Sequence, residues 1–86
     1  MSHRYFNCDG IDVLAGYDLA EEHYFLVVSY NDEILFTSEE LIDPKIDVRD
    51  IMRYVKRFMM TPPGSFYFDL ACDEAFKRDK VIKDYR

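Results

Sequence analysis

The sequence has no tryptophan, only three glycines, and none of the short motifs that carry catalysis or cofactor binding. Three scattered glycines cannot build the glycine-rich loop that cradles a phosphate group. A GxSxG nucleophile motif is missing, and no serine or cysteine stands at a recognisable spacing from a histidine. We therefore predict no catalytic residue, no cofactor-binding residue and no cofactor.

Metal-ligand motifs are missing as well. His3, His23, Cys8 and Cys72 are of the residue types that bind zinc, but they do not follow the paired spacing of a zinc site. The acidic residues follow no EF-hand spacing. The two cysteines form no CxxC pair, and we expect both to be free thiols. Motif spacing therefore predicts no metal ligand.

Long apolar runs are also missing. No stretch approaches the roughly 20 apolar residues of a membrane-spanning helix. The first residues, 1–5, contain no apolar signal core. With no sign of secretion, we expect a reduced, cytoplasmic protein with no membrane association.

The sequence is rich in apolar and aromatic residues. A chain of 86 residues has room for one core, so we expect a single α+β domain over residues 1–86. The composition, 49% hydrophobic and 33% charged, is typical of a globular protein. Seven tyrosines and seven phenylalanines are many for so small a core, so we expect at least three aromatic side chains at the surface.

Charge is distributed unevenly along the chain. Residues 1–44 contain ten Asp or Glu and a single basic residue, Arg4, which leaves a balance of −9. Residues 45–86 contain seven acids and ten Lys or Arg, a balance of +3. Either the two halves neutralise each other within the fold, or one of them faces a charged partner.

Two hairpins are predicted in the first half. Residues 24–30 are almost continuously apolar and β-branched or aromatic, which is typical of a central strand with both faces partly covered. The turn at Asn31-Asp32 leads to a second strand, 34–37. Asp9-Gly10 is a two-residue turn signal that predicts an earlier hairpin over residues 4–15. Gly16-Tyr17-Asp18 then breaks the alternating pattern.

A helix is predicted over residues 47–60. Asp47 suits the N-cap, and Asp50 three residues later completes a capping box. Apolar residues then recur at helical spacing, and Thr61-Pro62-Pro63-Gly64 ends the helix. A second helix is predicted over residues 73–85. The aromatic stretch 65–70 fits either a strand or the start of that helix.

The expected fold is therefore α+β. Two successive hairpins form an antiparallel sheet of three or four strands, and the long helix 47–60 packs across one face of it. The C-terminal helix covers the rest.

Hairpin geometry predicts a candidate binding site. The ends of antiparallel strands 24–30 and 34–37 lie together, so six acidic residues are expected at one end of the sheet: Asp18, Glu21, Glu22, Glu39, Glu40 and Asp43. A basic helix face is expected nearby, formed by Arg49, Arg53, Lys56 and Arg57. The acidic cluster fits a solvated rim, a surface for a basic protein partner, or a site for a divalent cation.

The stretch from Gly16-Tyr17-Asp18 to the strand Tyr24-Phe25-Leu26-Val27-Val28 resembles a family of short uncharacterised bacterial proteins, a domain of unknown function. In that family a Gly-aromatic-Asp sequence precedes an aromatic-rich strand. This chain has Leu19-Ala20 where a basic residue and a proline are expected. The resemblance implies a bacterial protein and assigns no active site.

Two classes of function fit these observations. The first is a non-catalytic interaction module, regulatory or inhibitory, with an acidic N-terminal half. The alternative is a small ligand- or metal-binding domain, or an enzyme, that uses the acidic cluster. A pI of about 4.7 argues against nucleic acid as the partner. A homodimer and a monomer both stay open.

Overall fold

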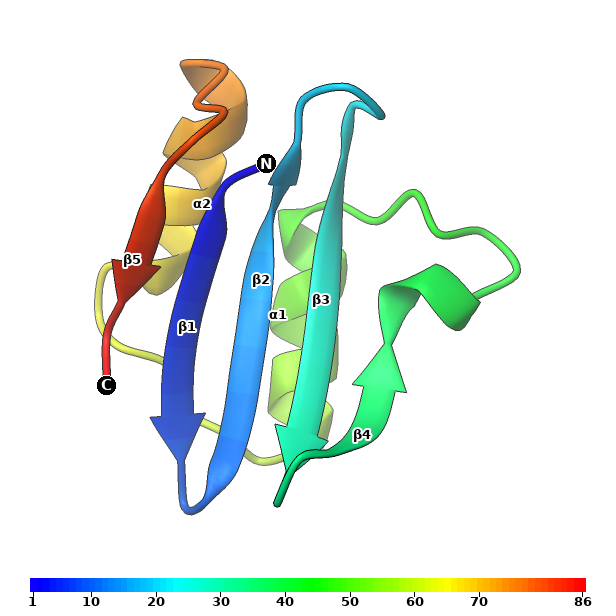
Figure 1. Ribbon diagram of the computed structural model, residues 1–86, viewed down its shortest axis with the longest axis vertical. Helices are drawn as coiled ribbons and strands as arrows, with labels where there is room; N and C mark the ends of the chain where they lie inside the picture. Colours follow the sequence, from blue (N-terminus) through cyan, green and yellow to red (C-terminus); the bar gives the residue numbers. More distant parts are fainter.

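The computed structural model describes all 86 residues, Met1–Arg86. Two helices lie on one face of a five-stranded sheet whose strand order is β4-β3-β2-β1-β5 (Figure 1). The elements follow in chain order as β1 (His3–Cys8), β2 (Ile11–Asp18), β3 (His23–Tyr30), β4 (Glu33–Thr37), the short 3-10 helix η1 (Ser38–Glu40), α1 (Val48–Arg57), α2 (Phe66–Ala75) and β5 (Ile82–Asp84).

The two predicted hairpins are confirmed. Asp9 and Gly10 have φ angles of 52° and 86°, so both central residues of the β1–β2 turn are left-handed, as a type I′ turn requires. Asn31 and Asp32 have φ angles of 50° and 64° and close the β3–β4 turn in the same way. Both hairpins are antiparallel, and β2 joins them by pairing with β3.

Strand β2 is longer than predicted. It continues through the expected break at residues 16–18, where Gly16 pairs with Phe25. The glycine is needed because a Cβ atom at this position would lie 1.9 Å from the carbonyl oxygen of Ser2 and 2.8 Å from the ring of Phe25. Gly16 therefore marks a close approach of backbones within the sheet rather than the end of a strand.

The core lies between the sheet and the helices. Alternate residues of the strands point towards the helices, and fully buried Val13, Leu26 and Val28 are among them. Ile51 and Val55 of α1, and Phe66 and Leu70 of α2, cover these strands and are also fully buried. The helices leave the other face of strand 24–30 uncovered, but Phe25 on that face is only 8% exposed and Val27 is half-buried. The prediction that both faces of this strand are partly covered is therefore confirmed.

Helix α1 begins as predicted and ends earlier. The Asp50 amide donates to the Asp47 side chain at 2.9 Å, and the Asp47 amide donates to the Asp50 side chain at 3.0 Å, completing the capping box. The helix ends at Arg57 instead of residue 60. Met59 has a φ of 55°, and the amide of Met60 donates to the carbonyl of Val55, which is the Schellman pattern. A helix of 10 residues replaces the long helix expected.

The bounds predicted for the C-terminal helix, 73–85, are wrong, whereas the alternative that residues 65–70 begin that helix is confirmed. Helix α2 spans residues 66–75 rather than 73–85, because Phe66, Leu70 and Asp73 recur at i, i+4 and i+7 and form its buried side. The chain then returns as strand β5, which pairs in parallel with β1 at the edge of the sheet (Figure 1). The α+β class is confirmed, whereas the sheet has five strands and one parallel pair.

Several smaller expectations can be compared with the structure. Cys8 and Cys72 are free and half-buried. Three aromatic side chains, Tyr30, Phe68 and Phe76, are exposed, as expected from the aromatic content. None of the helices has the length and apolar character needed to cross a bilayer.

Candidate functional site

The six predicted acidic residues are distributed over two places. Glu21 and Glu22 lie in the β2–β3 turn, whereas Glu39 and Glu40 lie in η1. Strand β4 ends at Thr37, which pairs with Val27, whereas β3 begins four residues earlier, at His23. These four residues correspond to roughly 13 Å along the strand. The expectation that they gather at one end assumed that β4 runs beside the whole of β3.

Two of these acids have local roles. The Asp18 carboxylate accepts hydrogen bonds from the amides of Ala20 and Glu21 at 3.1 and 3.2 Å, which shapes the β2–β3 turn. The Asp43 carboxylate accepts one from the amide of Lys45 at 3.1 Å. No three His, Cys, Asp or Glu side chains are arranged so that they could hold a metal ion. The observed contacts of Asp18 and Asp43 are those of turn-forming residues.

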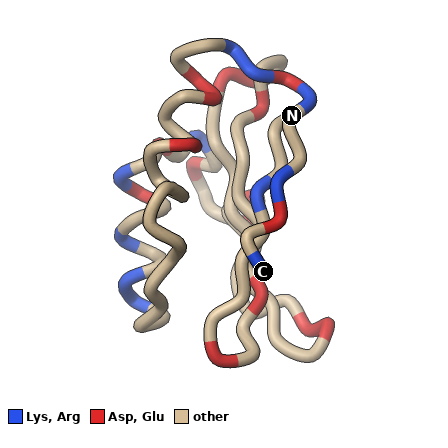
Figure 2. Tube along the Cα trace, turned by 90° about the vertical axis from the view of Figure 1, so that its left-hand side faces the viewer, with Lys and Arg blue, Asp and Glu red and all other residues tan.

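The predicted basic face lies on α1, in the layer of helices that covers the sheet (Figure 2). Arg49, Arg53 and Arg57 are spaced four residues apart and form one row, with Lys56 beside it. Within this set only Arg53 forms an ion pair, with Asp50 on the same helix. We call these four residues the basic ridge.

Few direct contacts join the acidic residues of the first half to the basic residues of the second. Of the ion pairs in the structure, only Arg86–Asp12, at 3.5 Å, joins an acid of residues 1–44 to a base of residues 45–86. The basic ridge therefore faces solvent without a carboxylate from the acidic half.

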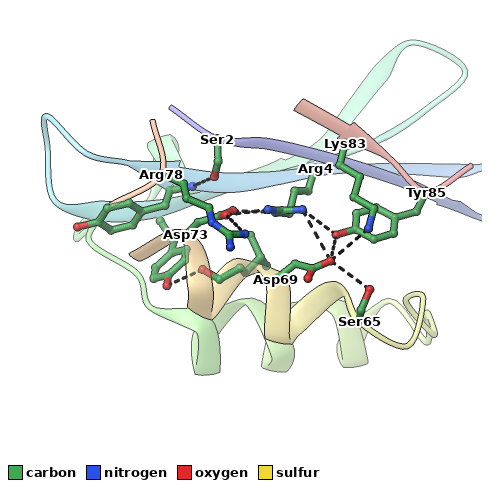
Figure 3. Close-up of polar contacts among 11 residues, drawn as sticks. Ser2, Arg4, Ser65, Asp69, Asp73, Arg78, Lys83 and Tyr85 are labelled. Atoms are coloured by element: carbon green, nitrogen blue, oxygen red, sulfur yellow. Dashed lines mark hydrogen bonds and ion pairs between the residues drawn. The ribbon is translucent and has the colours of Figure 1, made fainter. Parts of the chain in front are cut away.

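A buried polar cluster that the sequence did not reveal joins β1, α2 and β5 (Figure 3). Its centre is Arg4, whose Nε and Nη2 atoms donate to the two Asp73 oxygens, both at 2.7 Å. Arg4 is 2% exposed and Asp73 is fully buried. Tyr85 of the C-terminal segment accepts from Arg4 and donates to Asp69, and Ser65 also donates to Asp69.

The cluster changes the proton affinities of its members. The Asp73 hydrogen bonds raise the pKa of Arg4 against the effect of burial. Burial acts to raise the pKa of Asp69, but the hydrogen bonds from Tyr85 and Ser65 outweigh it and hold that pKa below its usual 3.8. Burial and the bond to Asp69 raise the pKa of Tyr85 to about 12. Every buried side-chain polar atom has a hydrogen-bond partner, so the cluster is consistent with a structural role in holding β5 against β1 and α2.

A hollow lies between the β4 edge of the sheet and α1. Its volume is about 410 Å³, and its lining consists of four apolar or aromatic side chains and one arginine: Phe36, Leu41, Tyr54, Phe58 and Arg57. The Phe36 and Tyr54 rings pack with centroids 4.5 Å apart. The Arg57 guanidinium lies 5.6 Å from the centroid of Tyr54, at cation–π distance.

Strand β4, which carries Phe36, is an outer strand with one unpaired edge. Ile34 and Leu35 are 61% and 48% exposed there. The strand contains no proline or lysine, the residues that commonly block pairing at an edge. A second hollow, about 230 Å³, lies on the uncovered face of the sheet beside Tyr5, but its rim charges, Asp12 and Arg86, pair with each other.

Comparison of the chain with protein-family models, with curated proteins and with solved structures found no match.

Proposed function

We propose that this protein is a non-catalytic interaction module that binds an extended segment of a partner protein along β4. The observation that carries the proposal is that an unpaired strand edge and an apolar hollow share one residue, Phe36. A segment added to β4 gains main-chain hydrogen bonds from the edge, and every second side chain points to the side of the sheet where the hollow lies.

The exposed side chains support this location. Ile34 and Leu35 are exposed apolar side chains on β4, close in sequence to Phe36, which lines the hollow. Exposed apolar patches commonly mark binding sites. The proposal includes a regulatory or inhibitory role in the cytoplasm, because a protein can regulate or inhibit its partner by binding alone. The acidic residues as a surface for a basic partner remain a separate hypothesis.

Photo-crosslinking in the native host tests the proposed surface. A photoreactive amino acid replaces Leu35 in one variant and Ile82, which is 74% exposed on the opposite edge, in another. We expect one stoichiometric protein adduct from position 35 and none of the same mass from position 82.

The matched pair Ile34→Lys and Ile82→Lys then separates edge binding from general stickiness. A lysine at position 34 should abolish the adduct formed at position 35, because a charged edge blocks strand addition. A lysine at position 82 should leave it intact. The proposal is rejected if the two positions capture the same proteins, or if Ile34→Lys leaves the adduct unchanged.

A further inference from the structure

We infer that the segment bound at β4 is acidic as well as apolar: one apolar side chain enters the hollow, and a neighbouring Asp or Glu pairs with Arg57. This inference rests on the proposed function and names the chemistry of the partner. It is carried by the position of Arg57, a member of the basic ridge that has no ion-pair partner, at an apolar hollow.

The first step concerns Arg57 itself. It lines the hollow, lies over the Tyr54 ring, and has no carboxylate of this chain within ion-pair distance. Stacking restricts the side chain while leaving its five N–H donors available, which lowers the entropic cost of binding a carboxylate. An anion at this rim gains a charge-assisted and potentially bidentate hydrogen bond.

The second step concerns the ridge around Arg57. Arg53 and Arg49 continue the row along α1, and Lys56 lies beside it, so positive charge extends away from the hollow. The chain as a whole has a formal charge of −6. A local basic surface in which only Arg53 is paired, with Asp50, favours an acidic segment over a basic one.

The third step concerns size. A hollow of about 410 Å³ with one polar side chain falls at the small end of binding pockets. It suits an aromatic or branched aliphatic side chain of a peptide, which acts as the anchor. Main-chain pairing to β4 supplies the register, so the acid must lie within a few residues of the anchor to reach Arg57.

Panning of a random dodecapeptide phage library on the intact protein tests the inference. We expect the selected peptides to combine an aromatic or aliphatic residue with Asp or Glu one to three positions away. On Arg57→Glu protein the acidic preference should disappear or change to Lys and Arg. Lys80→Glu removes an exposed charge outside the ridge and should leave the preference intact. Circular dichroism checks that both variants are folded.

Fluorescence titration with the most enriched synthetic peptide gives the magnitude. Arg57→Glu should weaken binding about tenfold or more, Arg57→Gln by less, and Lys80→Glu by less than about twofold. Selected peptides with no acidic bias, or with a bias that survives Arg57→Glu, overturn the inference and leave edge binding standing. Failure to enrich any peptide, or binding that Ile34→Lys does not weaken, overturns the proposed function itself.

Discussion

Replacement of Met59 by glycine is expected to stabilise the protein. Met59 follows the last turn of α1 with a φ of 55°. A non-glycine residue pays roughly 1–2 kcal/mol for this left-handed conformation. Its side chain is 91% exposed, so glycine removes almost no packing. Lys77, with a φ of 50° after α2, occupies the equivalent place.

The size of the effect follows from two opposed terms. Glycine relieves the left-handed strain, but its unfolded chain has more freedom, which costs about 0.5–1 kcal/mol. The net gain in the free energy of unfolding is about 0.5–1 kcal/mol. For a domain of 60–100 residues this raises the melting temperature by roughly 2–8 °C.

Met52→Gly is the matched control. Met52 is an exposed methionine of the same helix, 44% accessible, at an interior position with no left-handed φ. Glycine there should destabilise by about 1 kcal/mol or more, because the entropic cost is joined by the lost packing of a partly covered side chain. Urea unfolding followed by circular dichroism measures both variants. The reasoning is refuted if Met59→Gly is no more stable than the wild type while the slope of the free energy of unfolding against urea concentration is unchanged.

Three further predictions follow from burial, close approach and charge. Gly16→Ala should destabilise by about 2 kcal/mol, because the new Cβ meets the Ser2 carbonyl, and calorimetry showing an unchanged melting temperature would contradict the proposed close contact. The ionised Asp69 carboxylate stabilises the folded state, because its pKa is lower there than in the unfolded chain. This contribution is fully present above pH 3.8 and is lost as the pH falls through the lowered pKa, and Asp69→Asn should remove it. In urea the wild type should therefore be more stable than the variant at pH 7 and 5, and the difference should shrink as the pH is lowered below 3.8. Val28→Asp should unfold the protein because Val28 is fully buried, whereas Val27→Asp, half-buried on the uncovered face, should keep a dispersed amide NMR spectrum. Equal behaviour of the two aspartate variants would mean that the burial pattern of β3 is wrong.

The parts of the fold that could be predicted are those determined by neighbouring residues. Asp9-Gly10 and Asn31-Asp32 place left-handed residues at both hairpin turns, and Asp47 with Asp50 caps α1. Each signal acts within four residues, so no knowledge of the remaining chain is needed. The end of α1 was missed because Met59, which is not a glycine, gives no sign of its left-handed conformation.

The C-terminal segment was missed because distant residues determine it. The aromatic composition of residues 65–70 favoured a strand, yet helical burial of Phe66 and Leu70 decided the outcome. Strand β5 is only three residues long, and its pairing joins Ile82 to His3 at the other end of the sequence. So short a segment shows no alternating pattern from which a strand could be predicted. The Arg4–Asp73 pair that helps to hold it is equally remote in sequence.

The candidate site was missed for a related reason. The hollow takes its lining from β4, from the loop after η1 and from the end of α1, which come together only when the sheet and helices pack. Strand β4 ends at Thr37, opposite Val27, so it pairs with only the second half of β3, whereas the predicted acidic cluster required pairing along the whole of β3. Sequence did identify the basic ridge, because its residues lie on one helix at regular spacing.

The two edges of the sheet differ in a way that bears on the proposed function. At β5 the edge is short, contains Lys83 and Asp84, and is secured by Tyr85 and the buried Arg4 cluster. Charge and short length are devices that keep an edge from pairing with other chains. At β4 the edge is five residues long and begins with Glu33, and its pairing with β3 has a register shift, but the next two residues, Ile34 and Leu35, are apolar and exposed. Small domains are only marginally stable, and this one protects the β5 edge while the β4 edge stays open beside an apolar hollow. This asymmetry favours a bound partner at β4 as the physical reason for the open edge.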